Sequence, residues 1–344
     1  MQMDLFEFAE RMPKVELHVH LEGSILPRTL LKLAKRNQIT LTAQDVEGLE
    51  RLYHFRNFDQ FLESYITITS CLRTQDDYQL IAYEYGRECA RQNIRYAEVT
   101  ITVLTNTQLT GLSWQEILQG LNAGREQAHR EFGVWWQWIF DIVRNLPDTQ
   151  REVLDITLAA REMGVVGLGL GGSEDGYPPE LFVDTFHRAE MEGLHRVPHA
   201  GEIAGPKSVW SALKLLHAER IGHGVRSVED RSLVEFLREN SIPLEICPTS
   251  NIRLQVYRDY AHHPLRQLWD AGLQITIGSD DPPMFGTDLN HEFLVLVKEF
   301  GFTQSELERI SLNGIQASFL NLAEKQKITG EFRNEFLKLT KGEE

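Results

Sequence analysis

The amino-acid sequence predicts an α/β fold, a closed (β/α)₈ TIM barrel with a helical insertion after its first strand. Short apolar runs rich in Val, Ile and aromatic residues alternate eight times with longer amphipathic stretches. The length of 344 residues fits such a barrel with extensions to spare. Eight strand–helix units in one chain favour a closed barrel over an open sheet.

Each of the eight expected strands is bounded by Gly, Pro, Asn or Asp, as buried strands commonly are. In chain order they are residues 14–20, 95–102, 135–143, 165–170, 196–200, 220–224, 243–247 and 274–279. The stretches between them show helical spacing, and Phe182, Phe186 and Ala189, for example, share one apolar face. The alternation therefore predicts parallel strands covered by outer helices.

Residues 22–93 separate the first two expected strands and are predicted to form the helical insertion. Within it, four apolar side chains fall at positions i, i+3, i+4 and i+7 of one helix face. They are Phe58, Phe61, Leu62 and Tyr65. Two interpretations stay open: the stripe is ordinary core packing, or it is a lid that contacts an aromatic ligand.

No linker, repeat or low-complexity segment divides the chain, which predicts one domain over residues 1–344. The charged end, residues 325–344, is expected to be a terminal helix or a loose tail. The chain holds 35 Lys and Arg against 50 Asp and Glu, a net charge of −15. This acidic balance argues against nucleic acid or an anionic membrane as a partner.

Targeting and cysteine signals predict a cytoplasmic protein. The N-terminus lacks the basic and apolar regions of a signal peptide, and no stretch approaches the ~18 apolar residues of a membrane span. Cys71, Cys89 and Cys247 lie far apart without a CxxC pair. They are too few for a disulfide framework or a thiolate zinc cage, which fits a reducing compartment. The oligomeric state stays open.

Several histidines and acids fall at the carboxyl ends of expected strands, which meet at one mouth of a barrel. They are His18, His20, His199, His223, Asp280 and Asp281. His18 and His20 are two residues apart, so on a strand they face the same side. Imidazoles with a carboxylate suit a zinc-like divalent ion, and no thiolate is expected nearby. The other eight histidines are expected at the surface or in packing positions: His54, His129, His187, His195, His217, His262, His263 and His291.

Two acidic positions have more than one interpretation. Glu202 lies three residues after His199, and a carboxyl beside a metal cavity can be protonated and donate a proton. Taken alone, Glu202 equally fits the N-cap or the first turn of a helix. On an extended segment the side chains of Asp280 and Asp281 diverge, so one can bind metal and the other a ligand. Capping of the loop before Pro282 is the alternative.

Six short motifs occur in order along the chain. They are His18-Val19-His20-Leu21-Glu22-Gly23, His199-Ala200-Gly201-Glu202, Arg220-Ile221-Gly222-His223-Gly224, Cys247-Pro248-Thr249-Ser250-Asn251, Ser279-Asp280-Asp281-Pro282 and Asn313-Gly314-Ile315-Gln316-Ala317-Ser318-Phe319. Together they resemble the adenosine deaminase family of metal-dependent hydrolases. The resemblance runs from Pro13 to about Leu322, and the joint order of the motifs is specific although each motif alone is weak.

The resemblance implies a hydrolytic deaminase of 6-aminopurines that binds one Zn²⁺ per chain. The implied metal ligands are His18, His20, His199 and Asp280. Glu202 would protonate purine N1 as water adds to C6, and His223 would orient that water or take its proton. Ammonia then leaves, and a 6-oxopurine remains.

Further positions are implied as substrate contacts. Asp281 would hydrogen-bond N7, and the backbone N–H of Gly172 would meet N3. His20 and Glu22 are further expected contacts. Glu22 stands where adenosine-specific members carry an Asp that contacts the ribose. The lid interpretation adds Phe61, Leu62 and Tyr65.

Three competing functions are weaker. Binuclear relatives carry a bridging lysine on the fourth strand, and residues 165–172 contain none. The glycines of residues 167–172 form a GxGxxG pattern, but no strand with a terminal acid follows about 20 residues later, as a dinucleotide site requires. A catalytically silent purine-binding barrel would be free to lose the acid and ligand residues that this chain retains.

The choice of aminopurine depends on local departures from the family pattern. Glu22 and residues 171–174 differ from adenosine-specific members, as they do in relatives that act on free adenine or on 6-amino-6-deoxyfutalosine. Residues 247–251 and 280–287 look less like the adenine-specific branch. The sequence therefore predicts a nucleoside, adenosine or aminodeoxyfutalosine, with free adenine as the alternative.

Overall fold

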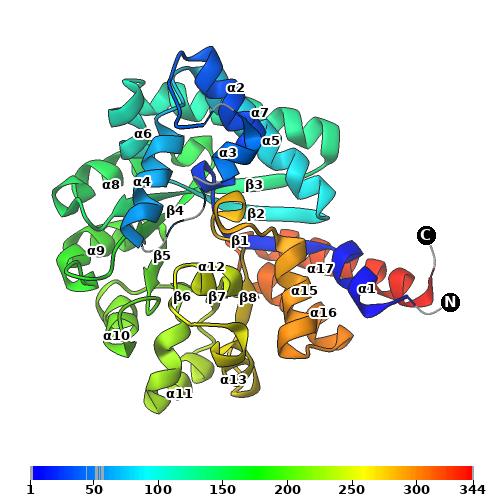
Figure 1. Cartoon of the computed structure of the whole chain (residues 1–344). Coiled ribbons are helices and arrows are strands. Elements are labelled where there is room, and N and C mark those ends of the chain that lie inside the picture. Colours follow the sequence, from blue (N-terminus) through cyan, green and yellow to red (C-terminus); the bar gives the residue numbers. More distant parts are fainter. Residues whose placement is uncertain (1–2, 44, 51–52, 54, 56–57, 343–344) are drawn as a thin grey trace.

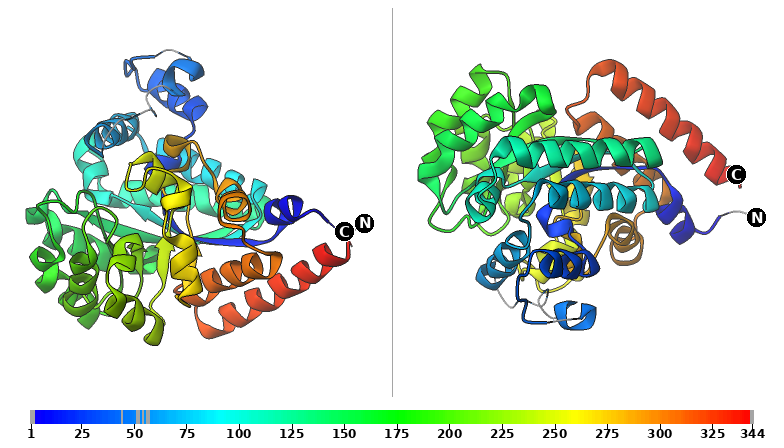
Figure 2. Two further views of the ribbon diagram at one scale, coloured as in Figure 1. Left: turned by 60° about the horizontal axis from the view of Figure 1, so that its bottom comes forward. Right: turned by 90° about the horizontal axis from the view of Figure 1, so that it is seen from above.

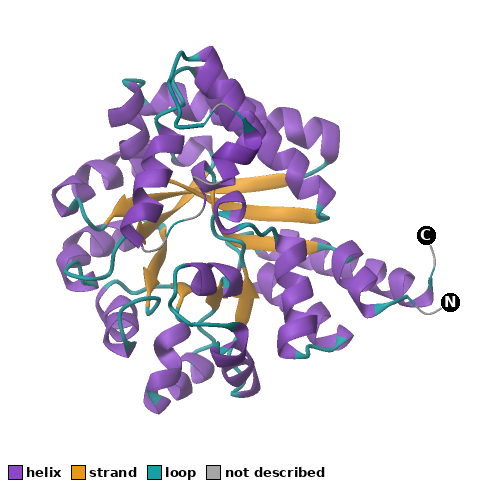
Figure 3. Cartoon of the chain, in the orientation of Figure 1, coloured by secondary structure: helices purple, strands orange, loops and turns teal. Residues whose placement is uncertain are grey.

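Eight parallel strands form a barrel that is surrounded by helices (Figures 1 and 3). The computed structural model describes residues 3–342 except 44, 51–52, 54 and 56–57, so His54 lies outside the described residues. Neighbouring strands pair in chain order from β1 to β8. A parallel bridge between Val19 and Asp280 joins the end of the last strand to the first. The predicted TIM barrel is therefore confirmed.

The strands lie where the apolar runs predict them. Their bounds are β1 Lys14–His20, β2 Ile94–Ile101, β3 Trp135–Val143, β4 Val165–Gly171, β5 His195–Ala200, β6 Ile221–His223, β7 Leu244–Ile246 and β8 Ile275–Ile277. β1 and β3 match the expected ranges residue for residue. The last three strands are shorter than expected, because the residues that follow them turn into the loops at the mouth of the barrel.

Helices connect the strands and extend both ends of the chain. Their bounds are α1 Leu5–Arg11, α2 Pro27–Arg36, α3 Val46–Glu50, α4 Phe58–Thr69, α5 Gln75–Arg91, α6 Val103–Thr110, α7 Trp114–Phe132, α8 Gln150–Ala159, α9 Val183–Met191, α10 Pro206–Leu215, α11 Arg231–Glu239, α12 Pro248–Arg253, α13 Leu265–Asp270, α14 Pro282–Phe285, α15 Leu289–Phe300, α16 Gln304–Ala317 and α17 Leu322–Lys341. Among the helices described, none is long and apolar enough to cross a membrane.

The expected insertion divides into two parts. Its last helix, α5, begins with a capping box of Thr74 and Asp77 and packs along α7 and against β2, as an outer helix of the barrel does. The helix α7 begins with the same device, formed by Ser113 and Glu116. α2, α3 and α4 instead project together from the barrel (Figure 2).

The charged end of the chain is a helix and not a loose tail over the residues described. Asn321 caps α17, and the side chains of Phe332 and Phe336 are buried. The ring of Phe336 lies 6.2 Å from that of Phe8 in α1. This contact brings the two ends of the chain together on one side of the barrel (Figure 2).

One glycine makes room at the mouth of the barrel. Gly222 lies in β6 beside two imidazoles, and a Cβ atom there would be 2.9 Å from His18 Cε1 and 3.1 Å from the His199 Cα. Any other residue would push these two histidines apart. The fold thus prepares a close approach of side chains from strands that are far apart in the sequence.

Candidate active site

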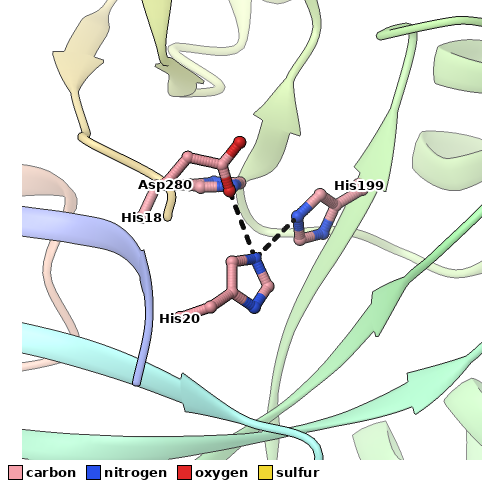
Figure 4. Close-up of side chains that lie close together, drawn as sticks. All are labelled: His18, His20, His199 and Asp280. Carbon is pink, nitrogen blue, oxygen red and sulfur yellow. Dashed lines mark hydrogen bonds and ion pairs between the residues drawn. The ribbon is translucent and has the colours of Figure 1, made fainter. Parts of the chain in front are cut away.

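Three imidazoles and one carboxylate meet at the carboxyl ends of the strands (Figure 4). His18 and His20 belong to β1, His199 lies in β5, and Asp280 follows β8. Their ligand atoms all lie within 4.8 Å of one another. His20 Nε2 is 3.3 Å from His199 Nε2 and 3.4 Å from Asp280 Oδ1. The structure therefore brings together the four residues that the sequence predicts as metal ligands.

Closure of the barrel places Asp280. Its backbone N–H donates to the carbonyl of His18 (3.1 Å), and its own carbonyl accepts from the N–H of His20 (2.9 Å). Asp280 has a φ of +64° and is thus in the left-handed region, so the expectation of an extended segment was wrong. The two bonds to β1 turn the chain at this residue and aim its carboxylate at the imidazoles.

The charges of this cluster fit a divalent cation. Burial lowers the pKa of His20 to about 4 and that of His199 well below the usual value, so both keep neutral nitrogen lone pairs. Burial also disfavours a charged His18, but Asp280 and Glu245 outweigh it and raise the pKa of His18 to about 10. The surroundings of His18 Nε2, which has no hydrogen-bond partner, therefore favour a positive charge. The neutral nitrogens of His20 and His199, and the carboxylates that favour a positive charge beside His18, match zinc ligation.

A thiol lies closer to the cluster than the sequence suggests. Cys247 follows β7, and its Sγ falls in a second group of possible ligand atoms with His18, His223 and Asp280. The sequence analysis expected no thiolate here, and it did not place this cysteine beside the cluster. Burial raises the pKa of Cys247 well above its usual value. Because the thiolate is the form that binds metals, the histidine and aspartate set is the better fit.

A buried network supports the candidate ligands from behind. Glu245 Oε2 lies 2.9 Å from His18 Nδ1, and Arg220 Nε donates to Glu245 Oε1 at 2.6 Å. Ser250 Oγ donates to Asp280 Oδ2 at 2.6 Å. Such partners fix the tautomer and orientation of metal-binding side chains. The sequence analysis missed these residues, although a charged residue inside an apolar run, as Glu245 is, was a signal.

Glu202 lies in the loop between β5 and α10, with its carboxyl in the cavity. Oε2 is 3.7 Å from His223 Nε2, and the buried Oε1 has no hydrogen-bond partner. Burial and the negative charges of Asp280 and Glu174 raise the pKa of Glu202 well above its usual value. These surroundings favour the protonated carboxyl, which is the form that a general acid requires.

Glu174 holds the loop that carries Glu202. Its carboxylate accepts one side-chain and four backbone hydrogen bonds. The donors are the N–H groups of Gly201, Glu202, Ile203 and Ala204 (2.8, 3.0, 2.8 and 2.9 Å) and the hydroxyl of Ser208 (2.6 Å). This buried acid was not among the predicted site residues. It holds Glu202 in the loop before α10, so Glu202 is neither the N-cap of this helix nor in its first turn.

Asp281 is buried beside the candidate ligands and packs against a glycine. A Cβ atom on Gly23 would lie 1.7 Å from Asp281 Oδ1, so this position admits only glycine while Asp281 keeps its place. Burial and the charge of Asp280 raise the pKa of Asp281 well above its usual value. Oδ1 has no hydrogen-bond partner, which leaves it available to a ligand.

A cavity of about 310 Å³ opens above the candidate metal site, at the lower end of the range of small-molecule sites. Its lining combines buried polar residues around the candidate metal site with apolar residues from other elements, among them the exposed Ile66 and Leu146. The residues that line it are His20, Phe58, Phe61, Leu62, Tyr65, Ile66, Thr102, Thr105, Asp141, Val143, Asn145, Leu146, Gly171, Gly172, His199, Glu202, His223, Leu254, Asp280 and Asp281. Gly172, with a φ of +92°, is among these lining residues, and its expected contact with purine N3 stays a prediction.

Two acids depart from the expected arrangement. Glu22 is fully buried, and its Oε1 accepts from the N–H of Thr102 (3.0 Å) and the amide of Asn106 (2.5 Å). It is therefore not among the residues that line this cavity, and its longer side chain explains the difference, because it reaches Asn106. Asp141 of β3 lines the cavity instead, with Oδ1 unpartnered, and burial raises its pKa to about 7. An acid inside the run 135–143 was the missed signal.

The apolar stripe of α4 serves both packing and the cavity. Phe61 is 7% exposed, and its ring stacks on that of Phe285 at 5.4 Å. Phe58, Leu62 and Tyr65 are partly buried, and all four residues of the stripe line the cavity. The two interpretations of the stripe are therefore compatible.

Leu62→Ala separates the two roles of the stripe. We expect KM to rise by roughly tenfold, because an apolar contact with the ligand is lost. Ile68→Ala is the matched control, since Ile68 is 1% exposed on the same helix but does not line the cavity. It should lower the free energy of unfolding by about 2–5 kcal/mol and leave KM unchanged. Loss of stability alone in Leu62→Ala would assign the stripe to the core.

Comparison with known protein families assigns the chain to one of them. The model of the adenosine deaminase family matches residues 13–334. The chain belongs to the adenosine deaminase family. This assignment confirms the resemblance of the motifs and the expected enzyme class, a hydrolase that acts on C–N bonds.

Relatives in this family carry different substrate names. An aminodeoxyfutalosine deaminase of Streptomyces avermitilis is 41% identical over 333 residues, which is 95% of this chain and 92% of the relative. An adenine deaminase of Bordetella parapertussis is 36% identical over 314 residues, or 91% and 98% of the two chains.

Solved structures of the family share the barrel. The adenine deaminase from Arthrobacter aurescens superposes with a TM-score of 0.90 at 34% identity, covering 95% of this chain and 99% of the other. An amidohydrolase from Burkholderia ambifaria with bound Zn reaches a TM-score of 0.91 at 27% identity, covering 99% and 96%.

Proposed function

We propose that this protein is a zinc-dependent aminohydrolase that converts a 6-aminopurine nucleoside, aminodeoxyfutalosine or adenosine, to the 6-oxopurine and ammonia. The observation that carries the proposal is that four possible nitrogen and oxygen ligands meet beside a cavity that also holds the buried carboxyl of Glu202. The identity to aminodeoxyfutalosine deaminases supports the larger nucleoside.

In this proposal His18, His20, His199 and Asp280 hold one Zn²⁺ per chain. A zinc ion so held supplies an activated water at neutral pH. The support for the site lies in the chain itself: the unpartnered Nε2 of His18, the neutral nitrogens of His20 and His199, and Glu245 behind His18.

The protein's own groups then handle the purine. Glu202 donates its proton to N1, which draws electron density from C6 and opens that carbon to attack by water. His223 orients the attacking water or takes its proton. Asp281 binds N7, and the N–H of Gly172 meets N3. The hydroxyl proton of the adduct passes to the 6-amino group as the C6–N bond breaks, so that ammonia leaves and the water oxygen remains on C6 as a carbonyl.

Free adenine is the second candidate substrate. Asp141 favours it, because an unpartnered carboxyl oxygen in the cavity could accept the ring N–H that a free base has and a nucleoside lacks. The adenine deaminases among the relatives favour it as well. The apolar outer part of the cavity, with Leu62, Ile66 and Leu146, favours a substrate that extends beyond the base.

The deciding experiment is a comparison of kcat/KM for aminodeoxyfutalosine, adenosine and adenine with ammonia release as the readout. We expect a nucleoside to exceed adenine by roughly tenfold or more, since each lost 1.4 kcal/mol of binding energy costs that factor. A clear preference for adenine would contradict the proposal of a nucleoside. No ammonia from any of the three, in protein that binds zinc, would leave a purine-binding barrel.

A further inference from the structure

Behind His223, on the side away from Glu202, lies a chain of buried hydrogen bonds that no catalytic role yet explains. Asn251 Nδ2 lies 3.3 Å from His223 Nδ1, and Asn251 Oδ1 lies 3.0 Å from His263 Nε2. His263 Nδ1 in turn meets the backbone N–H of Leu265 at 3.2 Å. Asn251 is on α12 and fully buried, while His263 follows the short turn 260–262 and is 5% exposed.

The direction of this chain is fixed at its far end. A backbone N–H can only donate, so Nδ1 of His263 must accept and carries no proton. Neutral His263 then bears its hydrogen on Nε2 and donates it to Asn251 Oδ1. This bond orients the amide of Asn251, whose NH₂ donates to His223 Nδ1.

The surroundings of His263 keep it neutral. Its ring contacts those of Tyr257 (5.1 Å) and Phe300 (5.7 Å). Burial lowers the pKa of His263 to about 3. A second proton on this ring would sit on Nδ1. Its hydrogen would then face the hydrogen of the Leu265 N–H, and neither of the two would have an acceptor.

We propose that Asn251 and His263 are positioning residues that hold the hydrogen of His223 on Nε2, so that His223 donates a hydrogen bond into the cavity. Glu202 Oε2 and Asp280 Oδ2 lie 3.7 and 3.9 Å from Nε2, beyond a hydrogen bond, so neither carboxyl group takes up this N–H. His223 lines the cavity, so the N–H can meet a ligand there.

This proposal rests on the proposed function, which leaves open whether His223 orients the attacking water or takes its proton. With Nε2 already carrying hydrogen, neutral His223 has no lone pair directed at the attacking water, and it orients this oxygen by donating to it. The water proton must then go to another group. Glu202, whose carboxyl lies beside the same nitrogen, can accept it once it has given its own proton to N1.

Asn251→Asp is the decisive variant. It keeps the shape of the side chain and the acceptor for His263, but a carboxylate cannot donate to His223 Nδ1, so the hydrogen of His223 should move from Nε2 to Nδ1. The measurement is ¹⁵N NMR of the zinc-loaded enzyme with labelled histidines, in which His223→Gln identifies the signal. In the wild type we expect Nε2–H, and in Asn251→Asp we expect Nδ1–H. kcat should fall by about 10²-fold, as when a donor to a reacting oxygen is lost, with KM little changed.

The exposed neighbour His262 supplies the control, because His262→Gln leaves the buried chain intact and should retain kcat and the His223 signal. A wild-type spectrum with hydrogen on Nδ1 of His223 would overturn the proposal without any variant, and so would unchanged kcat in Asn251→Asp. Wild-type Nε2–H in a protein that deaminates none of the three substrates would support the tautomer and count against the proposed function instead.

Discussion

Glu202→Gln is expected to retain zinc and the fold while kcat for deamination falls by about 10²–10⁴-fold, the usual contribution of a general acid. Glutamine has nearly the same shape, and its amide can still accept and donate hydrogen bonds, but it cannot give a proton to N1. The loop itself should not move, because Glu174 holds it through backbone N–H groups that the substitution leaves in place. Steady-state kinetics with metal analysis of the same sample are the measurement.

The matched control is Glu235→Gln, the same chemical change on the exposed face of α11. It should leave both kcat and zinc content unchanged. Near-normal turnover in Glu202→Gln would remove this residue from the role of acid, whereas loss of zinc would show that its carboxyl belongs to the metal site.

The strands and the candidate ligands could be predicted from the sequence because both depend on local patterns. In residues 14–20 Val and Leu alternate with polar residues, and residues 135–143 are mostly aromatic or β-branched, and these two patterns locate β1 and β3 residue for residue. The position of His18 and His20 at the end of β1 then follows from the alternation of side chains along a strand.

The supporting residues could not be predicted because they depend on which strands meet. Glu245 reaches His18 only after β7 and β8 close the barrel beside β1, and Arg220 joins them from the start of β6. The left-handed conformation of Asp280 likewise comes from two backbone bonds to β1, which no local pattern encodes. The partner of Glu22 could not be predicted for a similar reason, since Asn106 lies 84 residues along the chain.

The buried charges beneath the site form a connected network. Arg220 lies between Glu98 and Glu245, with Nη1 2.6 Å from Glu98 Oε2 and Nε 2.6 Å from Glu245 Oε1. Glu245 in turn contacts Nδ1 of His18. Because buried charges are costly unless paired, the network is stable only as a unit. The network holds the Glu245 carboxylate against His18, so the orientation of this candidate ligand and the packing of the barrel interior depend on the same side chains.

His18→Ala is therefore expected to have the second large effect, a loss of zinc and with it of turnover. Removal of a supporting partner typically lowers metal affinity by about 10–100-fold, and loss of a ligand should exceed that. Glu245→Gln keeps His18 but weakens the hydrogen bond that orients it, so its zinc affinity should lie between those of the wild type and His18→Ala. His291→Ala removes an exposed histidine from the start of α15 and should bind zinc normally. Zinc per chain after dialysis against a graded chelator orders the four proteins, and full occupancy in His18→Ala would exclude this imidazole from the ligands and leave Cys247 as the nearest replacement.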